Sequence, residues 1–243
     1  MNTLDSRCWT PLHTAAAANQ RAVFPLLIES GADINAFDIN GQSPLILAIN
    51  NHHLDGVFDL CEAGADVNAS DSRHMSPLCM AARRGIEMTN LLLAFRPNPS
   101  LKDAGGWTPL YWALYGEDYE DETIDIVRAL LEAGADPNIM SQDVLPPIDV
   151  AAKQGNASAV KLLIEHGADP NLSASGLDTA LYDAIVSGSL ETVMAFLEGG
   201  AECQIRFKDG WTPMMLVAKQ GDREIGRVLK RKGCGLNDQD LMV

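Results

Sequence analysis

Asp149 and Asp183 are the residues of this chain whose types and positions best suit acid–base chemistry. Each follows the start of an expected helix by a few residues, and two carboxyl groups beside Lys153 and Tyr182 could hold and transfer a proton. The alternative is structural, because an aspartate in the first turn of a helix also caps or pairs within that turn. We keep catalysis as an alternative interpretation and assign no catalytic residue.

The other nucleophiles and bases form no recognised catalytic pattern. The sequence has no G-x-S-x-G, H-E-x-x-H, P-loop or G-x-G-x-x-G motif. The cysteines include no C-x-x-C pair, and no histidine is spaced to complete a zinc site. We therefore expect a protein that is not an enzyme and binds neither a cofactor nor a metal. We expect reduced thiols in a cytoplasmic or nuclear protein at Cys8, Cys61, Cys79, Cys203 and Cys234.

The charge balance narrows the class of partner. The chain of 243 residues has 18 Lys and Arg against 33 Asp and Glu, a formal net charge of −15. Such a field repels phosphate backbones and anionic lipid headgroups, so we expect neither a nucleic acid nor a membrane as partner. The sequence shows no signal-peptide pattern and no long apolar run, while its 47% hydrophobic content is enough for a packed core.

A two-part pattern recurs along the chain. Seven tripeptides resembling Thr-Pro-Leu start 33, 33, 32, 38, 33 and 33 residues apart. Each predicts a helix start, because Thr or Ser caps free N–H groups and Pro is tolerated in the first turn. A motif resembling G-A-D-x-N follows each tripeptide, and its glycine predicts the end of a second helix. The tripeptides start at Thr10, Ser43, Ser76, Thr108, Pro146, Thr179 and Thr212.

The pattern resembles the ankyrin repeat, whose unit starts with T-P-L-H-x-A-A and ends with G-A-D-V-N. Residues 10–16 read TPLHTAA and residues 64–68 read GADVN. The resemblance covers residues 5 to 238 and implies an all-α solenoid of helix–turn–helix units with short hairpin-like turns, forming one domain over 1–243. It also implies that His13 hydrogen-bonds between turns. The implied repeats are 5–37, 38–70, 71–102, 103–140, 141–173, 174–206 and 207–238.

Ankyrin proteins generally bind partners in a concave groove lined by the turn tips and the exposed side of each first helix. Aromatic residues occupy the same turn position in three repeats of this chain, and a basic cluster lies between two of them. Trp and Arg dominate interface energies, although the tryptophans could instead pack on their own turns and the arginines could form a solvated face. The resemblance then implies partner-binding residues at Trp9, Arg73, Met75, Arg83, Arg84, Lys102, Trp107, Tyr115 and Trp211.

The centre of the groove is expected in the third and fourth repeats. There Met75, Trp107 and Tyr115 would form an apolar pocket rimmed by the arginines, suited to a protein or peptide with acidic and aromatic residues. The fourth repeat also carries an insertion, residues 116–122, which we interpret as a solvated loop, with contact to a basic partner as the alternative. We predict a monomeric protein-interaction scaffold. The alternatives are a small-molecule enzyme or ligand-binding protein using the same groove, and a recognition domain of a larger multidomain protein.

Overall fold

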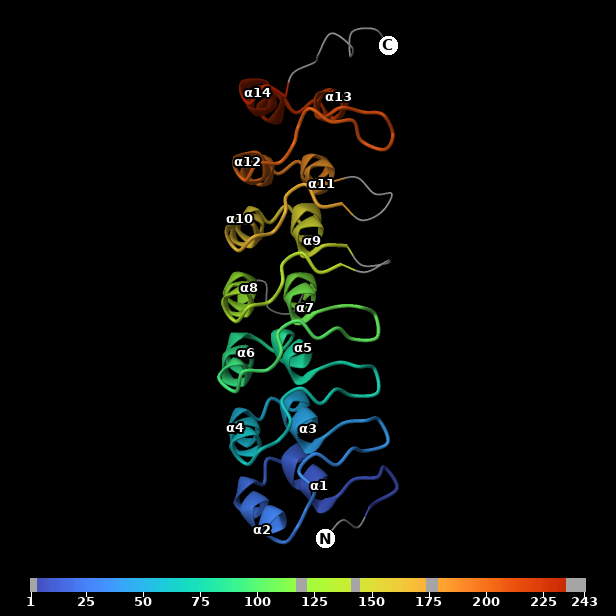
Figure 1. Ribbon diagram of the computed structural model, residues 1–243, viewed down its shortest axis with the longest axis vertical. Helices are drawn as coiled ribbons and strands as arrows, with labels where there is room; N and C mark the ends of the chain where they lie inside the picture. The colour runs from blue at the N-terminus through green and yellow to red at the C-terminus, as the bar shows by residue number, and fades with distance from the viewer. Residues whose placement is uncertain (1–3, 117–121, 141–144, 174–178, 235–243) are drawn as a thin grey trace. The chain divides into compact units, whose positions relative to one another are not determined.

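The computed structural model describes residues 4–116, 122–140, 145–173 and 179–234. Within these residues all regular structure is helical, which confirms the expected all-α fold (Figure 1). The chain divides into two compact units, residues 1–135 and 136–243, which are described in turn below. The expectation of a single domain over 1–243 stays a prediction, and most of the acidic insertion lies outside the described residues.

Unit 1 contains four helix pairs, one for each of the first four expected repeats. The first helices pack on one another in order, and the second helices form a neighbouring layer, with the turns projecting beyond the first-helix layer (Figure 1). The first helices are α1 (Pro11–Ala17), α3 (Pro44–Asn50), α5 (Pro77–Ala82) and α7 (Pro109–Tyr115). The second helices are α2 (Phe24–Glu29), preceded by the 3-10 turn η1 (Arg21–Val23), then α4 (Leu54–Glu62), α6 (Ile86–Leu93) and α8 (Thr123–Glu132).

Unit 2 contains three helix pairs with the same two-layer arrangement. Helix α11 packs between α9 and α13, and α12 packs between α10 and α14. The first helices are α9 (Pro147–Lys153), α11 (Ala180–Ser187) and α13 (Pro213–Gln220). The second helices are α10 (Ala157–Glu165), α12 (Leu190–Glu198) and α14 (Arg223–Arg231).

Side-chain caps start the first helices where the tripeptides predict them. Thr10 Oγ1 accepts a hydrogen bond from the backbone N–H of His13 at 3.3 Å, and the Thr10 N–H donates back to His13 Nδ1 at 3.1 Å. With Nδ1 accepting, His13 Nε2 carries the proton and donates to the Gln42 carbonyl at 3.1 Å. The expected bridge between turns is therefore confirmed for His13. The side chains of Ser43, Ser76, Thr108 and Thr212 each accept the corresponding backbone hydrogen bond, without the reciprocal bond seen at His13.

The core of each unit lies between its two helix layers. Small residues in the first helices, such as Ala16 and Ala82 at 0% and 3% exposed, allow neighbouring helices to approach closely. The second helices bury larger side chains, such as Val57 and Leu60, both 0% exposed. None of the helices in the described part of the chain is both long and apolar enough to cross a membrane.

Asparagine side chains join the loops of neighbouring repeats. Asn35 Oδ1 accepts a hydrogen bond from the backbone N–H of Asp66, and Asn68 Oδ1 accepts one from Asn98, each at 2.8 Å. Because each amide oxygen fills a backbone donor in the next loop, the asparagine of the G-A-D-x-N motif ties successive repeats together. Unit 2 repeats the contact at Asn138 and Asn171.

Two or three residues after the end of each second helix, one residue has a positive φ, as the glycine of the motif predicts. Gly64, for example, has a φ of +93°. In the third repeat Arg96 stands at this position with a φ of +53°. Left-handed backbone disfavours any residue with a Cβ, so Arg96 is a local point of strain.

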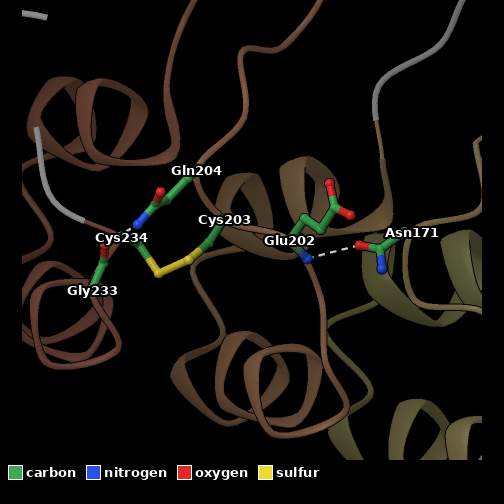
Figure 2. Close-up of a disulfide and its surroundings, with 6 residues drawn as sticks. All are labelled: Asn171, Glu202, Cys203, Gln204, Gly233 and Cys234. Carbon is green, nitrogen blue, oxygen red and sulfur yellow. Dashed lines mark hydrogen bonds between the residues drawn. A yellow bond between two sulfur atoms is a disulfide. The ribbon is translucent and has the colours of Figure 1, made fainter. Parts of the chain in front are cut away.

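A disulfide joins Cys203 to Cys234 in unit 2, with the two Cα atoms 5.3 Å apart (Figure 2). The expectation of five reduced thiols is therefore wrong for this pair. The two cysteines are 31 residues apart, and only the stacking of two successive loops brings them together. Beside the disulfide, Gln204 Nε2 donates a hydrogen bond to the Gly233 carbonyl at 2.9 Å (Figure 2). The free cysteines of the described residues are Cys8, Cys61 and Cys79.

Candidate interaction surface

Four aromatic side chains gather on α7 and on the turn that precedes it. The centroid of the Trp107 ring lies 4.6 Å from that of Trp112 and 4.8 Å from that of Tyr111. Tyr115 completes the group, 5.4 Å from Trp107 and 5.9 Å from Tyr111. Ring pairs at these separations stabilise the structure by more than the burial of their apolar area alone. We call these residues, Trp107, Tyr111, Trp112 and Tyr115, the α7 aromatic cluster.

Asp103 fixes the cluster from the turn. One carboxylate oxygen, Oδ1, accepts hydrogen bonds from the backbone N–H groups of Gly105 at 2.8 Å and Trp107 at 2.9 Å. The other, Oδ2, accepts from the indole N–H of Trp112 at 2.9 Å. One side chain thus holds both the turn and the nearest helical turn of α7. Tyr115 remains 52% exposed, so the cluster presents an aromatic surface that is already positioned for contact.

Two arginines from the third repeat lie next to the cluster or its turn. Arg83, the C-cap residue directly after α5, places its guanidinium carbon 4.6 Å from the centroid of the Trp112 ring. Arg73 lies at the turn tip, where its side chain is 68% exposed and pairs with Asp71 at 3.2 Å. The Arg73 carbonyl accepts a hydrogen bond from the Ala104 N–H at 2.9 Å, so the two turn tips are adjacent.

The remaining basic residues of the predicted cluster have separate positions. Arg84 Nη1 donates to His52 Nε2 at 2.8 Å, a contact that requires the ring nitrogen to be unprotonated. Burial, and then the charge of Arg84, lower the pKa of His52 below its ordinary value. Lys102 is exposed and directly precedes Asp103. Arg84 therefore points its charge toward the second repeat rather than toward the aromatic cluster.

The three predicted residues not yet described, Met75, Trp9 and Trp211, also lie outside the α7 aromatic cluster. Met75 is only 5% exposed, so its side chain is buried and does not lie on the accessible surface where the sequence predicts it. The Trp9 indole donates to Asp38 Oδ2 at 3.0 Å, which anchors this ring to the next turn. Trp211 belongs to unit 2, where the Lys219 ammonium lies 4.8 Å from its ring centroid.

Two residues of the cluster, Tyr111 and Trp112, were not predicted. Their signal was present in the sequence, because Tyr111 occupies the position of His13 in its repeat and Trp112 that of Thr14. The second repeat has Ile46 and Leu47 at these two positions, and the third has Cys79 and Met80, so the fold does not require two aromatic rings there. Departure from the repeat consensus would have identified these residues, whereas counting turn positions did not.

Of the acidic pair of unit 2, Asp149 is buried and Asp183 is partly exposed. Asp149 is 1% exposed, and its Oδ1 has no hydrogen-bond partner. Lys153 Nζ lies 3.9 Å from Asp183 Oδ2 on α11. Burial raises the pKa of Asp149 to about 7, and the charge of Asp183 acts in the same direction while Lys153 opposes it. This carboxyl keeps its proton to a higher pH than an exposed aspartate does, and it lies away from the accessible surface. Across the described residues no three His, Cys, Asp or Glu side chains are grouped to hold a metal ion.

Comparison with known proteins identifies the repeats. A family model described as ankyrin repeats in three copies matches residues 1–71, 70–141 and 148–240. A second model, ankyrin repeats in many copies, matches residues 120–164. Together these matches cover nearly the whole chain.

Curated relatives share part of the sequence. YahD of Escherichia coli (strain K12), named for its ankyrin repeats, is 29% identical over 157 residues, which is 64% of this chain and 78% of YahD. The ankyrin repeat protein nuc-2 of Neurospora crassa is 31% identical over 164 residues, 66% of this chain but 15% of nuc-2. The match thus spans most of the first relative and a small part of the second.

Solved structures share the fold. The ankyrin repeat domain of Bcl-3 superposes with a TM-score of 0.77 at 24% identity, covering 91% of this chain and 98% of that domain. The human ASB11 ankyrin repeat domain gives a TM-score of 0.70 at 25% identity, covering 92% and 98%. Ankyrin repeat domains are generally protein-interaction modules. On these sequence and structural matches, the chain belongs to the ankyrin-repeat family.

Proposed function

We propose that this protein is an interaction scaffold that binds a protein or peptide through the turns and first helices of its third and fourth repeats. The observation that carries the proposal is the α7 aromatic cluster, positioned by Asp103 and bordered by Arg83. Preformed aromatic surfaces with an arginine at the edge have the composition of interface hot spots. Because their side chains are already held by neighbours, little rotamer entropy is lost on binding.

The partner we propose carries aromatic and acidic residues. An aromatic side chain of the partner can stack on Tyr115, and a carboxylate beside it can pair with the guanidinium of Arg83 or Arg73. The net charge of the whole chain is −15, so an acidic partner is repelled at long range and attracted only at this basic surface. Selectivity should then come from this local contact, and raising the salt concentration should relieve the repulsion elsewhere.

The experiment is a display selection of random peptides on the full chain, followed by affinity measurements of the selected peptides. We expect enrichment of peptides that combine Trp, Tyr or Phe with Asp or Glu. The variants Arg83→Glu and Tyr115→Ala should each weaken binding about tenfold, the usual loss at a hot spot. Arg128→Glu is the matched control, because it reverses the same charge at an exposed arginine of α8, and this variant should bind like wild type.

Two results would overturn the proposal. Selected peptides without acidic residues would remove the chemistry assigned to the partner. Equal affinities for wild type and Arg83→Glu would remove the assigned surface, even if the chain still bound peptides.

A further inference from the structure

An open hollow with a mixed apolar and acidic lining lies on the second-helix layer of unit 1, between α4 and α6. Its lining consists of the apolar Leu54, Phe58 and Leu91 and the acidic Asp55 and Glu87. Phe58 is 46% exposed, although it is one of the largest apolar side chains in the second helices. The Phe95 ring supports Phe58 edge-on, with ring centroids 6.0 Å apart. The hollow therefore has an aromatic wall that is fixed on one side and open on the other.

Packing within the fold does not require an aromatic residue at position 58. This position lies six residues before the glycine of the G-A-D-x-N motif, and the same position in the next two repeats is Asn90 and Arg128. The core contacts of α4 come from its neighbours Val57 and Leu60, both 0% exposed. Phe58 is thus an exposed aromatic residue at a position where four of the other repeats carry a polar residue, Asn90, Arg128, Lys161 and Arg227, as expected for a contact surface.

The surroundings of the hollow are acidic. Glu62 and Glu87 are exposed and have no ion pair among the residues that the structure describes. Arg21 pairs with Asp55 at 3.0 Å and with Asp59 at 2.6 Å. The positive charge of Arg21 is therefore already balanced by these two carboxylates. An apolar floor with unpaired carboxylates around it is complementary to an apolar anchor flanked by Lys or Arg.

We propose that the hollow between α4 and α6 is a second docking site, which binds an amphipathic helix with an apolar anchor and a basic flank. The anchor packs against Phe58 and Leu91, and the basic residues pair with Glu87 and Glu62. This surface lies on the opposite helix layer from the α7 aromatic cluster and has the opposite charge. The two sites therefore recognise partners of different chemistry, and neither proposal depends on the other.

The test uses a fluorescein-labelled amphipathic peptide built from Leu and Lys, with a Leu and Glu peptide of the same pattern as control. Fluorescence anisotropy with the full chain is measured in salt of physiological strength, which screens long-range attraction to the acidic chain. We expect the Leu and Lys peptide to bind and the Leu and Glu peptide not to bind. Absence of binding by the Leu and Lys peptide would overturn the proposed partner chemistry.

Matched variants locate the site. Phe58→Asn introduces the residue that the next repeat tolerates at this position, so the fold is retained, and binding should weaken about tenfold. Glu87→Lys should weaken binding severalfold, whereas Asp125→Lys, the equivalent change on α8 one repeat further on, should not. Equal losses for the two charge reversals would mean general attraction to an acidic chain and would overturn the site. Circular dichroism melting checks that each variant is folded.

A crosslinking measurement gives the second readout. The Leu and Lys peptide carries a photoreactive benzophenone in place of one Leu, and the crosslinked residues are identified by mass spectrometry. We expect crosslinks within residues 54–62 and 86–95. Crosslinks confined to the α7 aromatic cluster would contradict a second site.

Discussion

Replacing Asp149 by asparagine should change how the stability of the protein depends on pH. The Asp149 carboxyl is 1% exposed on α9, and its Oδ1 has no hydrogen-bond partner. Burial raises its pKa from the ordinary 3.8 to about 7. The folded state thus binds the proton more tightly than the unfolded state, so the contribution to stability is complete below pH 4 and is lost as the pH rises to about 7.

The magnitude follows from the two pKa values. Each pKa unit of difference between the folded and unfolded states corresponds to about 1.4 kcal/mol. From 3.8 to about 7, the free energy of unfolding falls by an amount on the order of 4 kcal/mol. About 2.5 kcal/mol of this loss should occur between pH 5 and pH 8. The Asp149→Asn variant would have no such dependence, because an amide of similar shape does not ionise in this range.

The assay is urea unfolding of wild type and Asp149→Asn at pH 5 and pH 8, followed by far-ultraviolet circular dichroism. We expect the variant to gain stability over wild type by about 2.5 kcal/mol on going from pH 5 to pH 8. Asp183→Asn is the control, because removing the neighbouring charge should lower the pKa of Asp149 and flatten the wild-type dependence. Parallel pH profiles for wild type and Asp149→Asn would refute the reasoning.

Three further predictions concern stability. Cys203→Ser should lower the free energy of unfolding of unit 2 by about 4 kcal/mol, the chain-entropy value for the loop between Cys203 and Cys234, measured by non-reducing thermal or urea unfolding. Cys8→Ser is the control, and an equal stability with and without the disulfide would contradict the prediction. Arg96→Gly should raise the free energy of unfolding by about 1 kcal/mol, measured by urea unfolding, because glycine adopts the left-handed backbone without strain. Gly64→Arg should lower the free energy of unfolding by a similar amount. A destabilising Arg96→Gly would contradict the prediction and show that the Arg96 side chain makes a needed contact. Asn68→Ala should destabilise the protein by about 0.5 to 1.5 kcal/mol, the usual net value of one hydrogen bond, because water can replace the lost acceptor of the exposed Asn98 N–H. Asn40→Ala at an exposed turn is the control, and equal melting temperatures for the two variants would argue against the bridging role.

Much of the fold could be predicted because its determinants are local and repeated. A capping Ser or Thr, a following Pro and a glycine at a positive φ act within a few residues, and seven copies remove the ambiguity of each one. Thr179 shows the limit of this reasoning, since it starts α11 without a side-chain cap although its tripeptide resembles the others. The local pattern predicts the helix start correctly there, but it also predicts a capping hydrogen bond that Thr179 does not make.

The candidate site was less predictable because it depends on side-chain direction and on contacts between repeats. Met75 shares a turn with exposed residues, yet its side chain packs inward. Trp112 was missed because its place beside Trp107 and Arg83 follows from the stacking of α5 on α7. The pairing of Cys203 with Cys234 likewise arises from loop stacking across 31 residues, and no spacing in the sequence indicates it.

Hydrogen exchange on the full chain, with and without a saturating display-selected peptide, tests the central claim most directly. Binding at the α7 aromatic cluster predicts slower exchange in residues 103–116 and at the end of α5, with no change in α4. Protection confined to α4 and α6, or to unit 2, would contradict the proposal that the third and fourth repeats hold this partner through their turns and first helices.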